Sequence, residues 1–136
     1  MPAGELSPGE RFTLDEAIRK AEQACRYEFS VFVGRAEGDP RTFARSLHNS
    51  LVVPARSILI MVDPAARALE IVTGAEVRQT LSDNATELAA LHMRESFAIG
   101  DLVGGLEHGI GMLAEHARPP HYLHTGCPPT DAAGPG

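Results

Sequence analysis

The sequence predicts an α/β domain, and three observations lead to this fold class. The unbroken apolar run Ile58–Val62 is typical of a strand that is covered on both faces. Asp63-Pro64 then favours a turn, and Leu69–Val72 resumes a β-rich run, so residues 57–74 form a predicted hairpin. Amphipathic segments with capping residues precede and follow this hairpin, and we expect them to be helices that cover the sheet.

Length and composition limit the classes of function. The chain has 136 residues, of which 43% are hydrophobic, enough for the core of one domain. Asp and Glu number 18 against 12 Lys and Arg, and this acidic balance argues against a nucleic-acid partner. The first residues lack the pattern of a signal peptide, and no stretch reaches the ~20 apolar residues of a membrane span. Cys25 and Cys127 form no disulfide framework, so we expect a cytoplasmic protein. Cys25 lies on the apolar stripe of the first predicted helix, so we expect it to be a small core residue.

The boundaries of the domain follow from composition. Residues 1–12 are rich in Pro, Gly and charge and are expected to form a flexible arm. Thr13-Leu14-Asp15-Glu16 matches a capping box, which predicts a helix from there to about Arg26. Residues 13–117 then form the α/β domain. The Pro- and Gly-rich residues 118–136 are expected to be a disordered tail.

The first two strands are predicted to be parallel. Glu28–Val33 is the first strand, and Asp39-Pro40 starts a helix that leads to the strand beginning at Ser57. This arrangement is a βαβ unit, whose crossover is right-handed and whose strands are parallel. The hairpin places the third strand antiparallel to the second.

Helices are predicted to complete the chain after Gly74. Residues 75–81 are expected to form a short helix, and Ser82-Asp83 caps a longer one that reaches about Phe97. A last helix spans residues 102–117, with Gly105 and Gly109 one turn apart. Because glycine costs about 1 kcal/mol relative to alanine inside a helix, we expect these two glycines to pack closely on a neighbour.

Four segments of the chain carry a resemblance to a known family: Phe29–Gly34, residues 58–74, Leu81-Ser82-Asp83 and Phe97–Leu106. Together they resemble the TPM domain, and more closely an actinobacterial group of uncharacterised TPM-like proteins. The resemblance covers roughly residues 13–117. It implies a three-layer α/β/α sandwich with a small mixed sheet. Some TPM proteins bind calcium through carboxylates, a plant thylakoid member is described as an acid phosphatase, and others serve in membrane-protein assembly or maintenance.

Asp83 and Asp101 match the carboxylate positions of the TPM family, and each falls where a helix is predicted to begin. The resemblance implies that these two side chains hold Ca²⁺ or Mg²⁺, with Glu76, Glu95 or water completing the coordination shell. The alternative is that each aspartate caps its helix and complements the helix dipole. A bound cation could polarise a phosphomonoester, but a phosphatase also needs a nucleophile or an activated water, and the sequence singles out neither.

Other polar patterns give weaker indications of function. His121, His124 and Cys127 are metal-type ligands at short spacing, but they lack a fourth ligand and a framework, which favours a solvated tail. His92 and Glu95 lie one turn apart and are either a hydrogen-bonded pair or a support for a site near Asp101. The glycines of residues 100–111 run through a predicted helix, so they form no dinucleotide-binding loop. Motifs of the G-x-S-x-G and H-E-x-x-H type are absent.

The sequence therefore favours a non-catalytic, cytoplasmic, TPM-like module that acts through contacts with an unknown protein partner, with a divalent cation as a further ligand. A homo-oligomer is also expected, because the edges of a three-strand sheet need to be covered or paired. The alternative function is a divalent-metal-dependent enzyme of the acid phosphatase type that uses Asp83 and Asp101.

Overall fold

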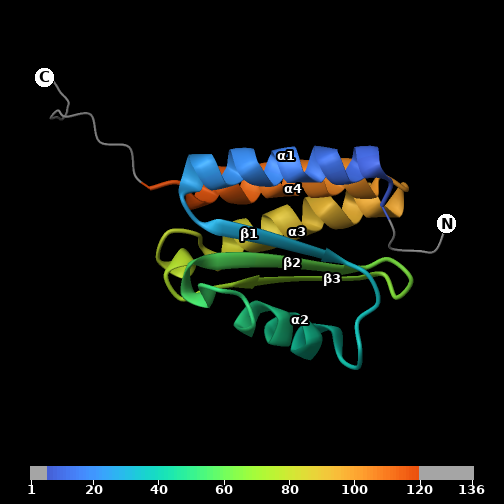
Figure 1. Ribbon diagram of the computed structural model, residues 1–136, viewed down its shortest axis with the longest axis horizontal. Coiled ribbons are helices and arrows are strands. Elements are labelled where there is room, and N and C mark those ends of the chain that lie inside the picture. Colours follow the sequence, from blue (N-terminus) through green and yellow to red (C-terminus); the bar gives the residue numbers. More distant parts are fainter. Residues whose placement is uncertain (1–5, 120–136) are drawn as a thin grey trace, which may run out of the picture.

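The chain folds into four α-helices, two 3₁₀ turns and three strands within residues 6–119, the part that the computed structural model describes. Their order is α1 (Pro8–Cys25), β1 (Glu28–Val33), α2 (Pro40–Asn49), η1 (Pro54–Arg56), β2 (Ser57–Asp63), β3 (Ala68–Thr73), η2 (Val77–Gln79), α3 (Asp83–Ala98) and α4 (Leu102–Ala117). Helices α1, α3 and α4 lie on one face of the sheet and α2 lies on the other (Figure 1). The predicted α/β class is confirmed.

The sheet is small and mixed, with strand order β1-β2-β3. β1 pairs with β2 in parallel, so that Phe29 lies opposite Ile58. β2 pairs with β3 antiparallel, so that Ile60 lies opposite Ile71. Both predicted strand directions are confirmed. Every residue of β2 is buried, which agrees with its unbroken apolar run, and β1 and β3 are the two edges of the sheet.

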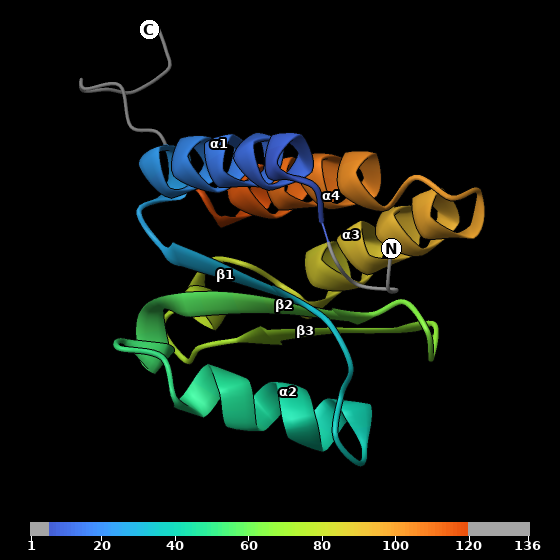
Figure 2. The same ribbon diagram turned by 45° about the vertical axis from the view of Figure 1, so that its right-hand side comes forward.

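Two hydrophobic clusters hold the layers together. The larger one lies between the sheet and the layer of α1, α3 and α4. Figure 2 shows this helix layer above the sheet. The smaller one lies under α2, where Ala44 is fully buried and Phe43, Leu47 and Leu51 are partly buried against it. The Phe43 ring meets the Phe32 ring of β1 edge-on, with ring centroids 5.4 Å apart. α2 thus packs its apolar side against the sheet.

The two glycines of α4 allow α3 to approach it closely. A Cβ atom at Gly105 would overlap the Ser96 and Phe97 side chains, and one at Gly109 would overlap Met93. Met93 is fully buried at this contact. The prediction that these glycines pack on a neighbouring helix is confirmed, because the space that they leave is occupied.

The predicted start of the first helix is wrong. α1 begins at Pro8, and its capping box is formed by Ser7 and Glu10. The Ser7 hydroxyl accepts a hydrogen bond from the Glu10 N–H at 3.1 Å, and the Glu10 carboxylate accepts one from the Ser7 N–H at 2.9 Å. Residues 8–12 are therefore helical and not part of a flexible arm. Pro8 occupies the first helical position, where its missing N–H costs nothing, so the Pro-Gly pair there is compatible with a helix.

The segment between β3 and α3 is less helical than predicted. Of residues 75–81, only Val77–Gln79 are helical, and this short helix is of the 3₁₀ type. Val77 is fully buried and fixes this turn to the larger core cluster. In residues 6–119, no helix combines the length and the apolar character that crossing a membrane requires.

Candidate functional site

A cleft of about 1030 Å³ lies beside β3, between α2 and the start of α3. Ile71–Gly74 line it along the strand, Arg41 and Arg45 line it from α2, and Asp83 and Glu87 line it from α3. The α2 wall therefore carries two arginines and the α3 wall two carboxylates, while Glu70 of β3 and Arg78 of η2 also line the cleft. We call this feature the β3 cleft.

The strand that lines the β3 cleft presents an open backbone edge. The Gly74 N–H donates to the Ser57 carbonyl of β2 at 3.0 Å. Because hydrogen-bonding directions alternate along an antiparallel strand, Leu69, Ile71 and Thr73 point their N–H and C=O groups away from β2. Within residues 6–119, the N–H groups of Ile71 and Thr73 have no hydrogen-bond acceptor. The edge could therefore pair with a further strand.

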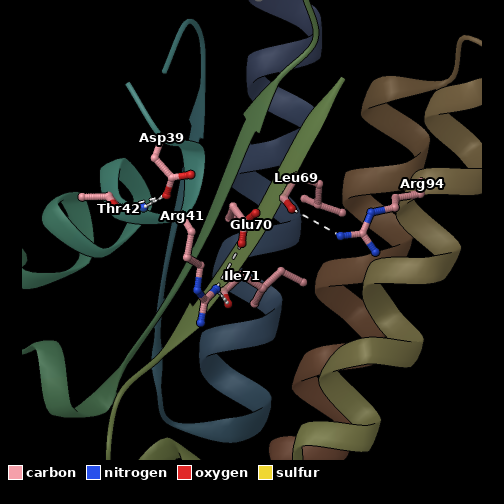
Figure 3. A network of polar contacts seen from close by, with 7 residues as sticks. All are labelled: Asp39, Arg41, Thr42, Leu69, Glu70, Ile71 and Arg94. Carbon is pink, nitrogen blue, oxygen red and sulfur yellow. Dashed lines mark hydrogen bonds and ion pairs between the residues drawn. The ribbon is translucent and has the colours of Figure 1, made fainter. Parts of the chain in front are cut away.

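Arginines from both sides of the sheet bind the outward carbonyls of this edge. The Arg41 guanidinium of α2 donates to the Ile71 carbonyl at 3.0 Å and also contacts the Glu70 carboxylate at 3.3 Å. The Arg94 guanidinium of α3 donates to the Leu69 carbonyl at 3.4 Å. Figure 3 shows the two side chains reaching β3 from opposite directions.

A third arginine completes this arrangement. Arg78, in η2, donates to the Thr73 carbonyl. The three outward carbonyls of β3 thus each accept from an arginine, and the three arginines come from three different elements. Guanidinium groups at a strand edge oppose the addition of another strand, because the carbonyls that it would use are already bound.

The α2 wall of the β3 cleft is fixed at both ends of the helix. At its start, the Asp39 carboxylate accepts from the Thr42 N–H at 2.9 Å and from the Thr42 hydroxyl at 3.0 Å (Figure 3). These bonds hold the pKa of Asp39 below its ordinary value and order the turn that carries Arg41. At its end, the buried His48 ring contacts the Ser57 carbonyl through Nε2 at 3.0 Å. The α2 wall of the cleft therefore belongs to a helix that is held in place at both ends.

The two carboxylates that the TPM resemblance pairs are not brought together. Asp83 opens into the β3 cleft and leaves the capping of α3 to Ser82, whose hydroxyl accepts from the Ala85 N–H at 3.1 Å. Asp101 caps α4 by accepting from the Gly104 N–H at 2.9 Å. α3 lies between them, and its 16 residues span about 24 Å. The two carboxylates therefore cannot ligate one ion in this arrangement.

The other predicted ligands also lie apart. Glu76 forms an ion pair with Arg56 at 2.8 Å, and Glu95 is exposed on α3. The His92 ring packs against the His108 ring of α4, with centroids 5.7 Å apart. Within the part of the chain that the structure describes, no three His, Cys, Asp or Glu side chains are grouped so that they could hold a metal ion.

The cysteine predictions differ in outcome. Cys25 is buried in the larger core cluster, and burial raises the pKa of its thiol, so its reading as a core residue is confirmed. His121, His124 and Cys127 lie outside the described residues.

A second cavity, of about 450 Å³, lies at the hairpin end and is lined by Asp63, Arg67 and Phe97 among others. This is the carboxyl end of the parallel strands, where open α/β sheets commonly bind ligands. The buried Asp63 carboxylate, however, accepts from the Ala36 N–H at 2.9 Å and from the Ala66 N–H at 3.2 Å. These bonds hold the pKa of Asp63 below its ordinary value, and the bond from Ala36 has the larger effect. Asp63 therefore ties the loop after β1 to the hairpin.

Sequence reasoning identified Asp83 but missed the arginines that bind the carbonyls of the β3 edge. Arg41, Arg78 and Arg94 belong to no motif and are separated by long stretches of chain. Their shared role depends on backbone carbonyls, which have no signature in the sequence. The one local signal was the Asp39-Pro40 start of α2, which fixes where Arg41 lies.

Comparison with protein families gives one match to most of the chain. The family described as "Domain of unknown function (DUF5130)" matches residues 5–114. Similar curated proteins include two uncharacterised proteins of Mycobacterium tuberculosis, from strains CDC 1551 and H37Rv. Each is 29% identical over 106 residues, which is 78% of this chain and 64% of the relative. The chain thus spans less than two thirds of the length of these relatives.

Solved structures of the same fold come from three bacteria. The NMR structure of the BA42 protein from Bizionia argentinensis has a TM-score of 0.72 at 20% identity and covers 82% of this chain and 81% of that one. The N-terminal domain of a protein from P. gingivalis has a TM-score of 0.70 at 17% identity, with 83% and 76% covered. The N-terminal domain of the cg2496 protein from Corynebacterium glutamicum has a TM-score of 0.69 at 15% identity, with 84% and 75% covered. At these identities the likeness shows the fold alone.

Proposed function

Because this chain belongs to a family of domains of unknown function (DUF5130), its surface has to indicate its role, and we propose that it is a non-catalytic module that binds a partner protein. The observation that carries the proposal is the edge of β3, where the outward N–H groups of Ile71 and Thr73 are open and the outward carbonyls are bound only by arginine side chains, along a cleft of about 1030 Å³. An extended segment can add to such an edge through main-chain hydrogen bonds, while the walls of the cleft select its side chains. The open N–H groups of Ile71 and Thr73 are the donors for this pairing.

The resemblance to TPM domains supports the same role. Some members of that family serve in membrane-protein assembly or maintenance, a role that requires contacts with other proteins. We place this chain with them as a TPM-like module of the cytoplasm. The acid phosphatase alternative needs Asp83 and Asp101 at one ion, and the length of α3 between them does not support it.

A divalent cation is a secondary part of the proposal. Asp83 and Glu87 lie one helical turn apart and both line the β3 cleft, so they could share one weakly held Ca²⁺ or Mg²⁺ ion while no partner segment occupies the cleft. Calorimetric titration with CaCl₂ or MgCl₂ is expected to give a binding heat at millimolar metal that is lost in Asp83→Asn. A wild-type chain that gives neither heat nor a thermal shift would remove the cation from the proposal.

Selection from a library of displayed random peptides tests the binding role directly. We expect the chain to enrich peptides whose binding is lost in Thr73→Pro, because proline removes an outward N–H and leaves the pairing with β2 intact. Val31→Pro is the matched control, since Val31 also points its N–H outward, on the opposite edge of the sheet. Circular dichroism would check that both variants fold.

Two results would contradict the binding role. One is a library that yields no peptide, or peptides that bind Thr73→Pro and the wild-type chain equally well. The other is turnover of an aryl phosphate that disappears in Asp83→Asn, which would instead support the phosphatase alternative.

A further inference from the structure

We propose that the segment received by the β3 cleft is an extended stretch of a partner protein in which acidic and basic side chains alternate. This inference rests on the proposed function and names the chemistry of the partner. It follows from the opposite charges of the two walls and from the way in which a strand distributes its side chains.

Successive side chains of a strand point to opposite faces of the sheet. In β3, Val72 belongs to the cluster under α2, whereas Ile71 belongs to the cluster under α3 and α4. A strand added beside β3 would continue both faces. Every second side chain would therefore point toward the arginine wall of α2, and the side chains between them toward the carboxylate wall of α3.

The spacing of the charges on each wall fits a strand. Arg41 and Arg45 are four residues apart on α2, and Asp83 and Glu87 are four residues apart on α3, which separates each pair by about 6 Å along its helix. Side chains two residues apart on a strand are separated by about 6.6 Å. Two acidic residues at positions i and i+2 would meet the arginines, and two basic residues at i+1 and i+3 would meet the carboxylates.

The arginines on the β3 carbonyls can exchange partners when the segment arrives. Arg41 binds the Ile71 carbonyl and Glu70 with a side chain that is 44% exposed, so it can swing away without disturbing the core. The N–H groups of the incoming strand would then take the carbonyls of Ile71 and Thr73, and its acidic side chains would take the guanidinium groups. Arg45 has no ion-pair partner within residues 6–119, so it can bind an acidic side chain without first releasing another carboxylate.

Two synthetic octapeptides of identical composition test the alternation. The probe is acetylated and amidated Glu-Lys-Glu-Lys-Glu-Lys-Glu-Lys, which sorts its charges by face. The control is Glu-Glu-Lys-Lys-Glu-Glu-Lys-Lys, which has the same zero net charge but mixes both signs on each face. At low ionic strength we expect the probe to bind with a Kd about tenfold lower than the control, because four weak charge contacts add together.

Variants locate the binding and identify its cause. We expect the preference for the probe to disappear in Arg45→Glu, which places a carboxylate on the basic wall, and to persist in Arg19→Glu on the exposed face of α1. Amide NMR signals of Ile71 and Thr73 should shift with the probe. Equal affinity for the two octapeptides, or no binding of the probe, would overturn the alternation. A library that enriches peptides of another pattern at this edge would still support the proposed function.

Discussion

The two edges of the sheet are protected by opposite chemical means. On β1, the outward N–H of Phe29 donates to the Glu22 carboxylate at 3.0 Å, so a side-chain acceptor binds a backbone donor. On β3, arginines bind backbone acceptors at three successive outward positions. Beyond Phe29, the β1 edge lines a groove of about 460 Å³ that includes Leu14, Ile18 and Val31. The β1 edge thus lies beside a mainly apolar groove, which Arg11 and Asp15 also line, and the β3 edge lies beside mainly charged side chains.

This difference shows how a small sheet controls what can pair with it. Glu22 lies seven residues before Phe29, so the protection of β1 comes from the adjoining helix. The arginines of β3 come from α2, η2 and α3, so its protection requires the complete fold. Exposed edges favour unwanted strand pairing, and a charged side chain that can be displaced blocks such pairing without closing the edge permanently.

The largest expected effect is a difference in stability between alanine substitutions at the two glycines that follow the edge strands. A Cβ atom at Gly74, after β3, would overlap the backbone carbonyls of Pro54 and Ala55, which cannot move easily. Gly74→Ala should therefore lower the free energy of unfolding by about 3 kcal/mol. Gly34, after β1, is the matched control, because its Cβ would meet only the Phe32 ring. Gly34→Ala should cost less than about 1 kcal/mol in urea melts, and equal losses would contradict the comparison.

Removing arginines from the β3 edge should have a smaller effect on stability but a distinct effect on association. Arg41→Ala combined with Arg94→Ala frees the carbonyls of Ile71 and Leu69, and we expect unfolding free energy to fall by about 1 kcal/mol. Sedimentation should then show more self-association than the wild-type chain gives at the same concentration. The control, Arg19→Ala with Lys20→Ala, removes the same charge from α1 and should leave the sedimentation profile unchanged.

The smallest expected effect is a dependence of stability on pH that comes from Asp63, which links the loop after β1 to the turn before β3. Asp63 accepts from Ala36, beyond β1, and from Ala66, before β3, and its pKa is lowered from an ordinary value of 3.8. The unfolded chain therefore binds a proton more readily than the folded chain. The contribution of the Asp63 carboxylate to stability is complete above its pKa in the unfolded chain and is lost as the pH falls through its pKa in the folded chain. Asp63→Asn should flatten the acid side of the stability curve, and an unchanged slope would contradict this account.

The sequence predicted the sheet well because its signals are local. The apolar run of β2 indicated a central strand, and Asp63-Pro64 indicated the hairpin, since both depend on residues adjacent in the chain. The start of α1 was misplaced because Ser7–Glu10 and Thr13–Glu16 both fit the pattern of a capping box. Only the first of them begins the helix, and Pro8 at its first position was interpreted as part of a loop.

The amino-acid sequence by itself determined the α/β class, the directions of the three strands and the close packing of Gly105 and Gly109, because periodicity, turns and helix caps act over a few residues. Only the tertiary structure decided which charged side chains share a site. It separated Asp83 from Asp101 by the length of α3 and brought Arg41 and Arg94 to one strand edge. Contacts between these distant side chains depend on how whole helices pack on the sheet. The arginines also bind backbone carbonyls, which every residue has and which the sequence therefore cannot distinguish.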